Sequence, residues 1–402
     1  MVYFISRIRR VKIRDILQVW KLFLCFLPAK VLKAVCHDIW IVSEAPGEAR
    51  DNGFWFFRYV CQNHPEHKCY YAIKHDSPDY EKVAAVGPTI EHGSLKHWVL
   101  YLAANKVVSS QKAMGPNAAI FSFLEVYGLL KNDRSFLQHG VIGNDLKWLY
   151  YDITKFKCFI CGAYPEYQFV SDIFGYPEGA VHYTGICRFD GLHDKTPDER
   201  LILIMPTWRE WIAYEDNRLL EVENTKQIQE SQYFKAWSSF ILDPHIERFC
   251  KEYNAKFVFF PHRDMQKFLD LFPKTNGYIT VAGAESFDVQ DLMKQASLMI
   301  TDYSSVFFDM LYMKKPVIYY QFDYDRFRSG QYGEGYFDYR NNPFAKSFDD
   351  SEKVFEELEW YLSNDFQIDD NYLNAHKEYF KLYDTDNCKR VYEAIVKEGT
   401  SN

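Results

Sequence analysis

Two histidines that directly follow short apolar runs are the residues of this sequence best suited to proton transfer. His139 follows the run Ser135–Leu137 in the string L-Q-H-G-V, and His262 follows Lys256–Phe260 in F-F-P-H-R-D. A free imidazole titrates near pH 6.5, so either side chain can accept or donate a proton near neutral pH. Taken alone, each is equally well explained as a hydrogen-bonded structural histidine. The choice between the two roles therefore depends on the residues around them.

Side chains that can donate to phosphate oxygens follow the apolar run Leu201–Ile204. The string M-P-T-W-R-E supplies Thr207 and Arg209, and the planar guanidinium of arginine can bind two phosphate oxygens at once. Arg263, next to His262, offers a second guanidinium. The alternative for the first string is an exposed loop with a structural Arg–Glu pair.

The segment of residues 297–325 predicts a strand–turn–helix–strand unit that can bind an anion. Leu298–Ile300 has the length of a buried strand, Val306–Met313 is typical of an apolar helix, and Val317–Tyr320 is a second strand. Free N–H groups and the positive end of the helix dipole favour an anion at such a turn. We therefore expect Ser304 and Ser305 to hold a phosphate, although a serine here can also simply cap the helix.

Two carboxylates belong to the same segment. Asp302 and Asp309 are seven residues apart, or two helical turns, so one helix face could carry both. We expect Asp302 to orient the turn and Asp309 to reach a ribose or polyol hydroxyl. The alternative for Asp309 is an ordinary carboxylate on a helix surface.

The fold class that places these residues is α/β, with two doubly wound domains. Short apolar runs alternate with helical stretches, which indicates parallel sheets covered on both faces. Ligands of open α/β sheets bind at the carboxyl ends of the strands, where all four segments fall. The predicted strands are Trp40–Val42, Cys69–Ile73, Lys106–Ser109, Ser135–Leu137, Phe156–Ile160 and Val181–Gly185, then Leu201–Met205, Lys256–Phe260, Tyr278–Val281, Leu298–Ile300 and Val317–Tyr320.

Length and charge agree with two domains and argue against nucleic acid. The chain has 402 residues and a net charge of −8, without a nucleic-acid-binding signature. A polar, turn-rich join at residues 188–200 separates a domain of residues 36–192 from one of residues 193–402. Charged amphipathic helices are expected over residues 351–398 of the second domain.

Residues 1–35 form a basic amphipathic segment. Its apolar run, residues 22–27, is shorter than the roughly 20 residues that span a bilayer. Cations interleaved with Trp20 and Phe23 favour an in-plane anchor on an anionic membrane; the alternative is a helix docked on the first domain. Against the single acid Asp15 stand Arg7, Arg9, Arg10, Lys12, Arg14, Lys21, Lys30 and Lys33.

The cysteines and nearby histidines offer a weaker metal hypothesis. An odd count of nine cysteines is typical of reduced thiols in a cytosolic compartment. Cys61, His64, His67 and Cys69 crowd together in C-Q-N-H-P-E-H-K-C and could ligate a metal. Their spacing matches no zinc motif, so the sequence gives no metal prediction.

Together the four segments resemble the CDP-glycerol:poly(glycerophosphate) glycerophosphotransferases, which include teichoic acid and capsule enzymes. The likeness rests on L-Q-H-G-V, M-P-T-W-R-E, F-F-P-H-R-D and L-M-I-T-D-Y-S-S-V-F-F-D followed by K-K-P-V-I-Y-Y-Q-F-D, over about residues 136–325. The string Q-H-G-V-I stands where teichoic acid members commonly have W-H-G-T-P, which leaves the acceptor open.

The resemblance implies a GT-B-type fold, two Rossmann-like domains facing a cleft, and peripheral attachment to the cytoplasmic face of the bacterial membrane. It implies transfer of a polyol phosphate from CDP-glycerol or CDP-ribitol to a lipid-linked or polymer acceptor, with release of CMP. No tightly bound cofactor is expected, and Mg²⁺ would enter only with the donor nucleotide. Carried over residue by residue, His139 is the base that activates the acceptor hydroxyl. The resemblance assigns the donor to His262, Arg209, Thr207, Ser304, Ser305 and Asp309.

Two other functions fit the same fold. A GT-B glycosyltransferase would use a nucleotide sugar, with attack at a sugar carbon. A non-catalytic protein would bind a nucleotide or a polymer at the membrane. Turnover of a CDP-polyol distinguishes the transferase from both.

Overall fold

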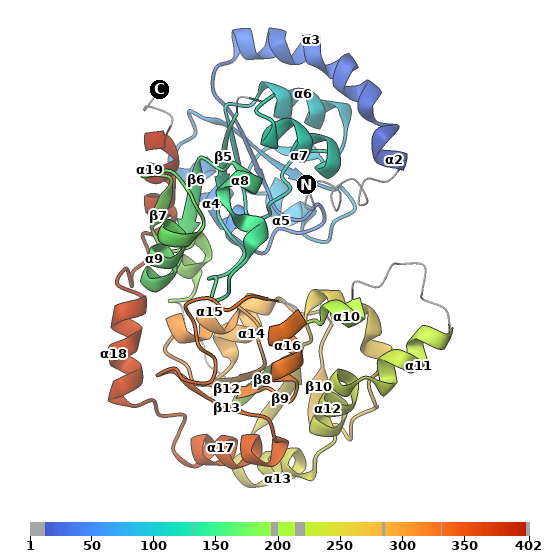
Figure 1. Ribbon diagram of the computed structural model, residues 1–402, viewed down its shortest axis with the longest axis vertical. Coiled ribbons are helices and arrows are strands. Elements are labelled where there is room, and N and C mark those ends of the chain that lie inside the picture. The colour runs from blue at the N-terminus through green and yellow to red at the C-terminus, as the bar shows by residue number, and fades with distance from the viewer. Residues whose placement is uncertain are drawn as a thin grey trace. The chain divides into compact units, whose positions relative to one another are not determined.

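Two parallel β-sheets, each in its own compact unit, make up the computed structural model (Figure 1). The structure describes residues 13–130, 132–193, 200–213, 222–283, 286–330 and 332–398. Unit 1 takes the chain up to His139, then Lys147–Asp190, and again from Asp384; unit 2 takes Gly140–Leu146 and Gly191–Tyr383.

The sheet of unit 1 has the strand order β3-β2-β1-β4-β5-β6-β7, with every neighbouring pair parallel. The central strands are buried on both faces, because helices cover the sheet on each side. Its strands are β1 (Ile39–Ser43), β2 (Lys68–Ile73), β3 (Thr89–Glu91), β4 (Lys106–Ser109), β5 (Asp133–Phe136), β6 (Cys158–Cys161) and β7 (Val181–Tyr183). Its helices are α2 (Ile13–Ile16), α3 (Val19–Val35), α4 (Asn52–Asn63), α5 (Tyr80–Ala84), α6 (Leu95–Ala103), α7 (Ala118–Val126), α8 (Tyr151–Thr154), α9 (Tyr164–Ile173) and α19 (Asn387–Glu398), with 3-10 turns η1 (Lys147–Leu149) and η2 (Cys187–Gly191).

The sheet of unit 2 has the order β10-β9-β8-β11-β12-β13 and is also parallel throughout. Its strands are β8 (Leu201–Met205), β9 (Lys256–Phe259), β10 (Ile279–Val281), β11 (Leu298–Thr301), β12 (Val317–Tyr320) and β13 (Ala345–Phe348). Its helices are α10 (Glu210–Ala213), α11 (Val222–Glu230), α12 (Gln232–Ile241), α13 (Pro244–Tyr253), η3 (Arg263–Leu271), α14 (Val289–Gln295), α15 (Phe307–Tyr312), α16 (Tyr324–Gly330), α17 (Ser351–Ser363) and α18 (Asp370–Tyr379).

The predicted α/β class and all eleven predicted strands are confirmed, with bounds that differ by up to two residues. Two strands were missed, β3 and β13, and both lie at a sheet edge. Neither T-I-E nor A-K-S-F is an apolar run, because an edge strand is only partly covered. The charged helices expected at the end of the chain are confirmed as α17, α18 and α19.

Much of the basic segment expected over residues 1–35 lies outside the described residues, including Arg7, Arg9, Arg10 and Lys12. The part that is described forms α2 and α3. Along the described chain, no helix combines the length and the apolar character needed to cross a bilayer.

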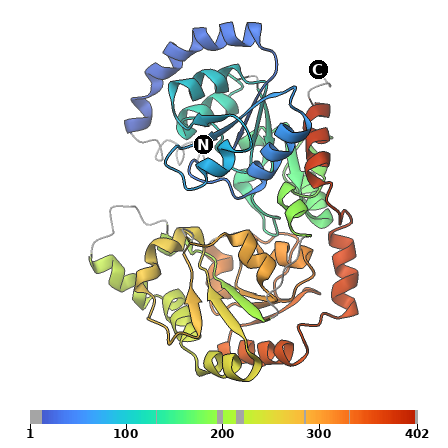
Figure 2. The ribbon, with the colours of Figure 1, turned by 180° about the vertical axis from the view of Figure 1, so that it is seen from behind.

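The last helix, α19, returns to unit 1, whereas the sequence placed it with the second domain. It packs against α4 and β6 (Figures 1 and 2). Asp190 holds its first turn: its carboxylate accepts the backbone N–H groups of Asn387 and Cys388, each at 2.9 Å. The side chain of Asn387 donates to the same carboxylate at 2.7 Å. A carboxylate at a helix N-terminus satisfies otherwise unpaired N–H groups and complements the helix dipole.

We expect Asp190→Ala to lower the free energy of unfolding by about 1–3 kcal/mol, because it removes the acceptor shared by the buried Asn387 side chain and two backbone N–H groups. Urea denaturation measures this loss. Asp386→Ala is the control, since Asp386 is exposed at the same helix start. An equal effect of the two variants would contradict the capping role of Asp190.

Candidate functional site

The residue before His139 has an unusual backbone conformation. Gln138 follows β5 with φ of 60°, a left-handed value that residues other than glycine rarely adopt. Its buried amide donates to the carbonyl of Ile160 at 2.6 Å and to Glu166 at 3.0 Å, which holds it there. Such conformations persist where surrounding contacts impose them, and they cluster at functional sites. The turn directs the chain so that His139 is exposed at the carboxyl edge of the sheet.

Two further side chains hold the backbone at this turn. Asn52, at the start of α4, donates to the carbonyl of Gln138 at 2.8 Å and accepts the backbone N–H of Arg188 at 2.9 Å. The guanidinium of Arg188 donates to the carbonyl of His139 at 2.9 Å and pairs with Asp51 at 2.6 Å. Three distant parts of unit 1 thus fix the main chain of His139.

The hydrogen bond of one ring nitrogen sets the tautomer of His139. Its Nδ1 lies 3.3 Å from the carbonyl oxygen of Ser110. A carbonyl oxygen can only accept, so Nδ1 carries the proton and Nε2 keeps its lone pair in the neutral ring. That arrangement suits a general base.

Glu44, directly after β1, organises the loop that carries Asp51 and Asn52. Its carboxylate accepts the N–H groups of Phe54 at 2.7 Å, Arg50 at 2.9 Å and Asp51 at 3.1 Å. Burial and the nearby charge of Asp51 raise the pKa of Glu44 to about 8. A Cβ at Gly53 would lie 2.7 Å from the Glu44 side chain, so only glycine allows this close approach.

In unit 2, a buried ion cluster joins three loops at the carboxyl edge of the sheet. The fully buried Arg209 pairs with Asp302, after β11, at 2.8 Å and with Asp323, after β12, at 2.7 Å. It also donates to the carbonyl of Thr207, after β8, at 2.9 Å. Asp302 in turn accepts the N–H of Thr207 at 2.7 Å. The aromatic rings that enclose the guanidinium belong to Tyr233, Tyr303, Phe322 and Phe327.

The geometry changes the role expected of Arg209. The sequence suggested a direct phosphate contact, but the side chain has no exposed surface and its donors are bonded within the protein. Arg209 therefore acts as a positioning residue in this structure. Burial raises the pKa of Asp302, while the charge of Arg209 opposes that shift.

His262 follows β9, the strand beside β8. Its backbone N–H donates to the carbonyl of Pro206 at 3.0 Å, next to the Thr207 loop. Its Nδ1 accepts the N–H of Asp264 at 3.2 Å, so Nε2 carries the proton in the neutral ring. The neutral ring of His262 is therefore the opposite tautomer to that of His139. Its Nε2–H is suited to donate to a phosphate oxygen. The adjacent Arg263 is exposed.

The turn after β11 differs in detail from the expectation. Helix α15 begins at Phe307, one residue later than predicted, with Val306 as its N-cap residue and no side-chain cap. Neither Ser304 nor Ser305 occupies the cap position; Ser304 is buried and Ser305 is partly exposed. Asp309 is fully buried rather than on a helix surface, so its carboxylate does not face solvent here.

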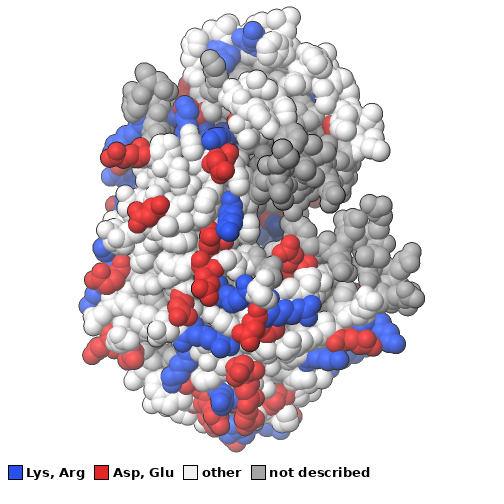
Figure 3. Space-filling model, in the orientation of Figure 1, with Lys and Arg blue, Asp and Glu red and all other residues white. Residues whose placement is uncertain are grey.

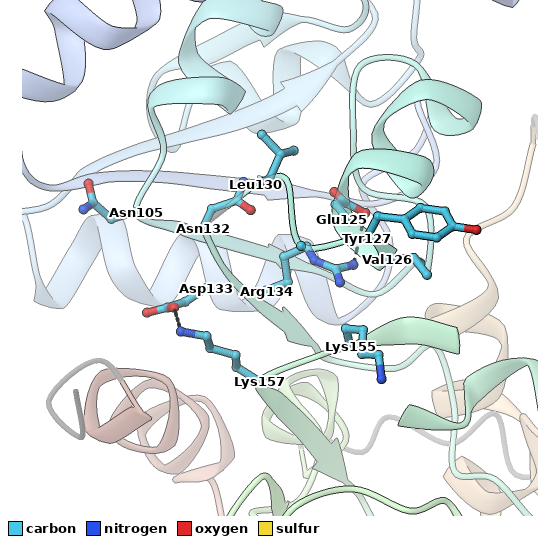
Figure 4. A pocket seen from close by; sticks show the side chains of 11 residues that line it. Asn105, Glu125, Val126, Tyr127, Leu130, Asn132, Asp133, Arg134, Lys155 and Lys157 are labelled. Atoms are coloured by element: carbon cyan, nitrogen blue, oxygen red, sulfur yellow. Dashed lines mark hydrogen bonds and ion pairs between the residues drawn. The ribbon is translucent and has the colours of Figure 1, made fainter. Parts of the chain in front are cut away.

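A surface pocket of unit 1 lies elsewhere. It has a volume of about 710 Å³, and among its lining residues are Asn105, Asp133 and Lys157, at the amino ends of β4, β5 and β6 (Figure 4). His139 follows the carboxyl end of β5. The pocket therefore contains none of the residues singled out above.

Sequence reasoning missed several positioning residues. Asp323 had a usable signal, since it follows a strand as Asp302 does. Asn52 and Arg188 had none, because each lies far from His139 in the sequence and contacts only its backbone.

We expect Arg209→Met to lower the free energy of unfolding by about 3–5 kcal/mol, because it leaves two buried carboxylates unpaired. The control is Arg248→Met, which breaks a partly exposed pair with Glu359 and should cost at most about 1 kcal/mol. Urea denaturation separates the two. Similar losses would show that the cluster does not hold the loops.

The raised pKa of Glu44 predicts a pH dependence of stability. The folded protein holds this proton between about pH 4.5 and about 8, where the unfolded chain releases it. The contribution of Glu44 should therefore fall by about 1.4 kcal/mol per pH unit as the pH rises through that window. Urea denaturation of the wild type and Glu44→Gln at several pH values tests this. A stability difference independent of pH would contradict it.

Comparison with known proteins agrees with this architecture. The chain is 31% identical over 364 residues to the minor teichoic acid biosynthesis protein GgaB of Bacillus subtilis strain 168, covering 89% of this chain and 40% of GgaB. It spans less than half the length of the curated relatives that it matches.

Two solved structures share the fold. The wall teichoic acid polymerase TagF superposes with a TM-score of 0.63 and 14% identity, covering 97% of this chain and 98% of that one. The MnaA–UDP co-structure of S. aureus gives a TM-score of 0.54 and 11% identity, covering 90% and 96%. These likenesses support a two-domain, Rossmann-like GT-B fold.

A family model matches residues 31–397, far more than the region of residues 136–325 on which the sequence motifs rest. This match shows that the chain belongs to the CDP-glycerol:poly(glycerophosphate) glycerophosphotransferase family.

Proposed function

We propose that this chain transfers a polyol phosphate, with glycerol phosphate as the first candidate, from a CDP-polyol to an acceptor hydroxyl in the synthesis of teichoic acid or a related surface polymer. The observation that carries the proposal is the pair of histidines held as opposite tautomers, each at the carboxyl edge of a parallel sheet. Family membership supports the donor class.

His139 supplies the base in this reaction. Its Nε2 takes the proton of the acceptor hydroxyl, and the hydroxyl oxygen attacks the phosphorus that bears the polyol. The bond from that phosphorus to the bridging oxygen breaks, and CMP leaves with the bridging oxygen. Removing the proton during attack makes the oxygen a stronger nucleophile, which is the ordinary work of a general base.

Unit 2 supplies the donor site. His262, through Nε2–H, and the exposed Arg263 stabilise the negative charge that develops on CMP, while Ser304 and Ser305 bind phosphate oxygens. Such a transfer needs positioning and charge neutralisation more than covalent help.

Arg209 and Asp302 act by fixing the loops at the carboxyl edge of the sheet, and Thr207 lies beside them. A divalent ion such as Mg²⁺ would enter with the pyrophosphate.

CMP release from CDP-glycerol and CDP-ribitol, with membrane lipid extract as acceptor, tests the reaction. We expect His139→Ala and His262→Ala each to lower the rate at least about 100-fold. His245→Ala is the matched control, since His245 is a partly buried histidine paired with Asp243 on α13. Undiminished CMP release by His139→Ala would refute the mechanism, and turnover of nucleotide sugars alone would favour a glycosyltransferase.

We further propose that α3 binds the cytoplasmic face of the bacterial membrane. One side of the helix, with Cys25 and Ala29 buried, packs against α6. The other side leaves large apolar side chains in solvent, with Phe23 76% and Leu27 68% exposed. The surface over α3 is largely white in Figure 3, with a few blue atoms of Lys or Arg at the top of the view. An apolar face flanked by cations suits insertion at an anionic lipid surface.

Vesicle cosedimentation tests this surface. We expect the wild type to bind phosphatidylglycerol vesicles and to bind neutral phosphatidylcholine vesicles much more weakly. Phe23→Ser with Leu27→Ser should lower binding at least about tenfold, because two inserting side chains are lost. Trp360→Ser, at an exposed tryptophan of α17, is the control. Equal binding by the double variant and the control would refute the role of α3.

A further inference from the structure

Two histidines and a glutamate of unit 1 lie together away from the candidate site. His64, Glu66 and His67 belong to the loop between α4 and β2, and their ligand atoms all lie within 4.8 Å of one another. Glu66 Oε1 is 3.2 Å from His64 Nδ1 and 3.9 Å from His67 Nε2. The carboxylate accepts the proton of His64 Nδ1 in this arrangement, and a bound metal ion would take the place of that proton. A tetrahedral zinc ion with bonds of about 2.0–2.1 Å keeps its ligand atoms roughly 3.4 Å apart. The two distances from Glu66 Oε1 are therefore close to this spacing, and the distance between the two imidazole nitrogens is at most 4.8 Å.

The hydrogen bonds of His67 prepare it for a metal. Its Nδ1 lies 2.6 Å from Asp38 Oδ2, and a carboxylate accepts, so Nδ1 carries the proton and Nε2 presents its lone pair to the cluster. A carboxylate behind a histidine is the usual arrangement around a metal-binding imidazole. In this structure the hydroxyl of Tyr392 lies 2.8 Å from Nε2 and donates a hydrogen bond to it.

The other histidine is also fixed in orientation. The ring of His64 stacks on the ring of Tyr392, with centroids 3.7 Å apart and an interplanar angle of 12°. Tyr392 lies on α19, so the cluster joins the loop before β2 to the last helix of unit 1. The cysteines that drew attention in the sequence are not part of the group: Cys61 and Cys69 are free thiols joined to each other by a hydrogen bond.

We propose that His64, Glu66 and His67 bind one divalent transition-metal ion, with Zn²⁺ as the best-fitting ion. Two imidazoles and one carboxylate suit zinc, whereas Mg²⁺ prefers an octahedral shell of oxygens. Water or the hydroxyl of Tyr392 fills the fourth position. Because α19 contributes Tyr392, the ion stabilises the attachment of this helix to unit 1.

The proposal is independent of the transferase activity. Asp38 precedes β1 and His67 precedes β2, so the cluster lies at the amino edge of the sheet. His139 follows the carboxyl end of β5, at the opposite edge. The ion is therefore placed to stabilise the fold, and its binding can be measured without turnover.

Isothermal titration calorimetry of the chelator-treated chain with ZnCl₂ tests the site, with MgCl₂ as the comparison ion. We expect one Zn²⁺ per chain, no saturable Mg²⁺ binding here, and a rise in melting temperature with Zn²⁺. His67→Ala should abolish this binding. Asp38→Asn, which keeps all three ligands, should weaken it about 10–100-fold. Co²⁺ should give the intense visible absorption of a four-coordinate site.

His75→Ala is the matched control, because His75 pairs with Glu91 at 3.2 Å in an exposed position. It should bind Zn²⁺ as the wild type does. Circular dichroism establishes that each variant is folded before titration. Absence of saturable Zn²⁺ binding by the wild type would overturn the proposal, as would wild-type affinity in both folded His67→Ala and Asp38→Asn.

Discussion

A guanidinium with no exposed surface must keep its carboxylate partners, and the candidate donor site depends on this requirement. Arg209 pairs with Asp302 and Asp323 and donates to the carbonyl of Thr207, so loops after β8, β11 and β12 are joined. Burying these charges is favourable only when every partner is in place. The cluster therefore fixes the arrangement of the three loops. Ser304 and Ser305 come shortly after Asp302 in the chain, so their position depends on it.

Unit 1 fixes its histidine by a different means. Buried amide and guanidinium groups hold the backbone of Gln138 and His139 rather than the imidazole itself. The left-handed conformation of Gln138 is tolerated because these contacts impose it. In both units the buried polar groups set the geometry of the carboxyl edge, beside the exposed His139 in unit 1 and the partly exposed His262 in unit 2.

The alternation of strands and helices was well predicted from the sequence, because strands buried on both faces consist of continuous apolar runs. The sequence could not predict the edge strands β3 and β13, since T-I-E and A-K-S-F are not apolar runs. It also placed α19 with the wrong unit, because a return of the chain depends on distant contacts such as that of Asp190 with Asn387. Which loops follow strands was predictable, whereas the burial of Arg209 and Asp309 was not. A polar residue after a strand has the same local signature whether it faces substrate or the core.

The central claim is that the two histidines are held as opposite tautomers. Long-range ¹H–¹⁵N correlation spectra of ¹⁵N-histidine-labelled protein measure this directly, with His139→Asn and His262→Asn variants assigning the signals. At a pH where both rings are neutral, the account predicts a proton on Nδ1 of His139 and on Nε2 of His262. A proton on Nε2 of His139, or the same tautomer for both residues, would contradict it.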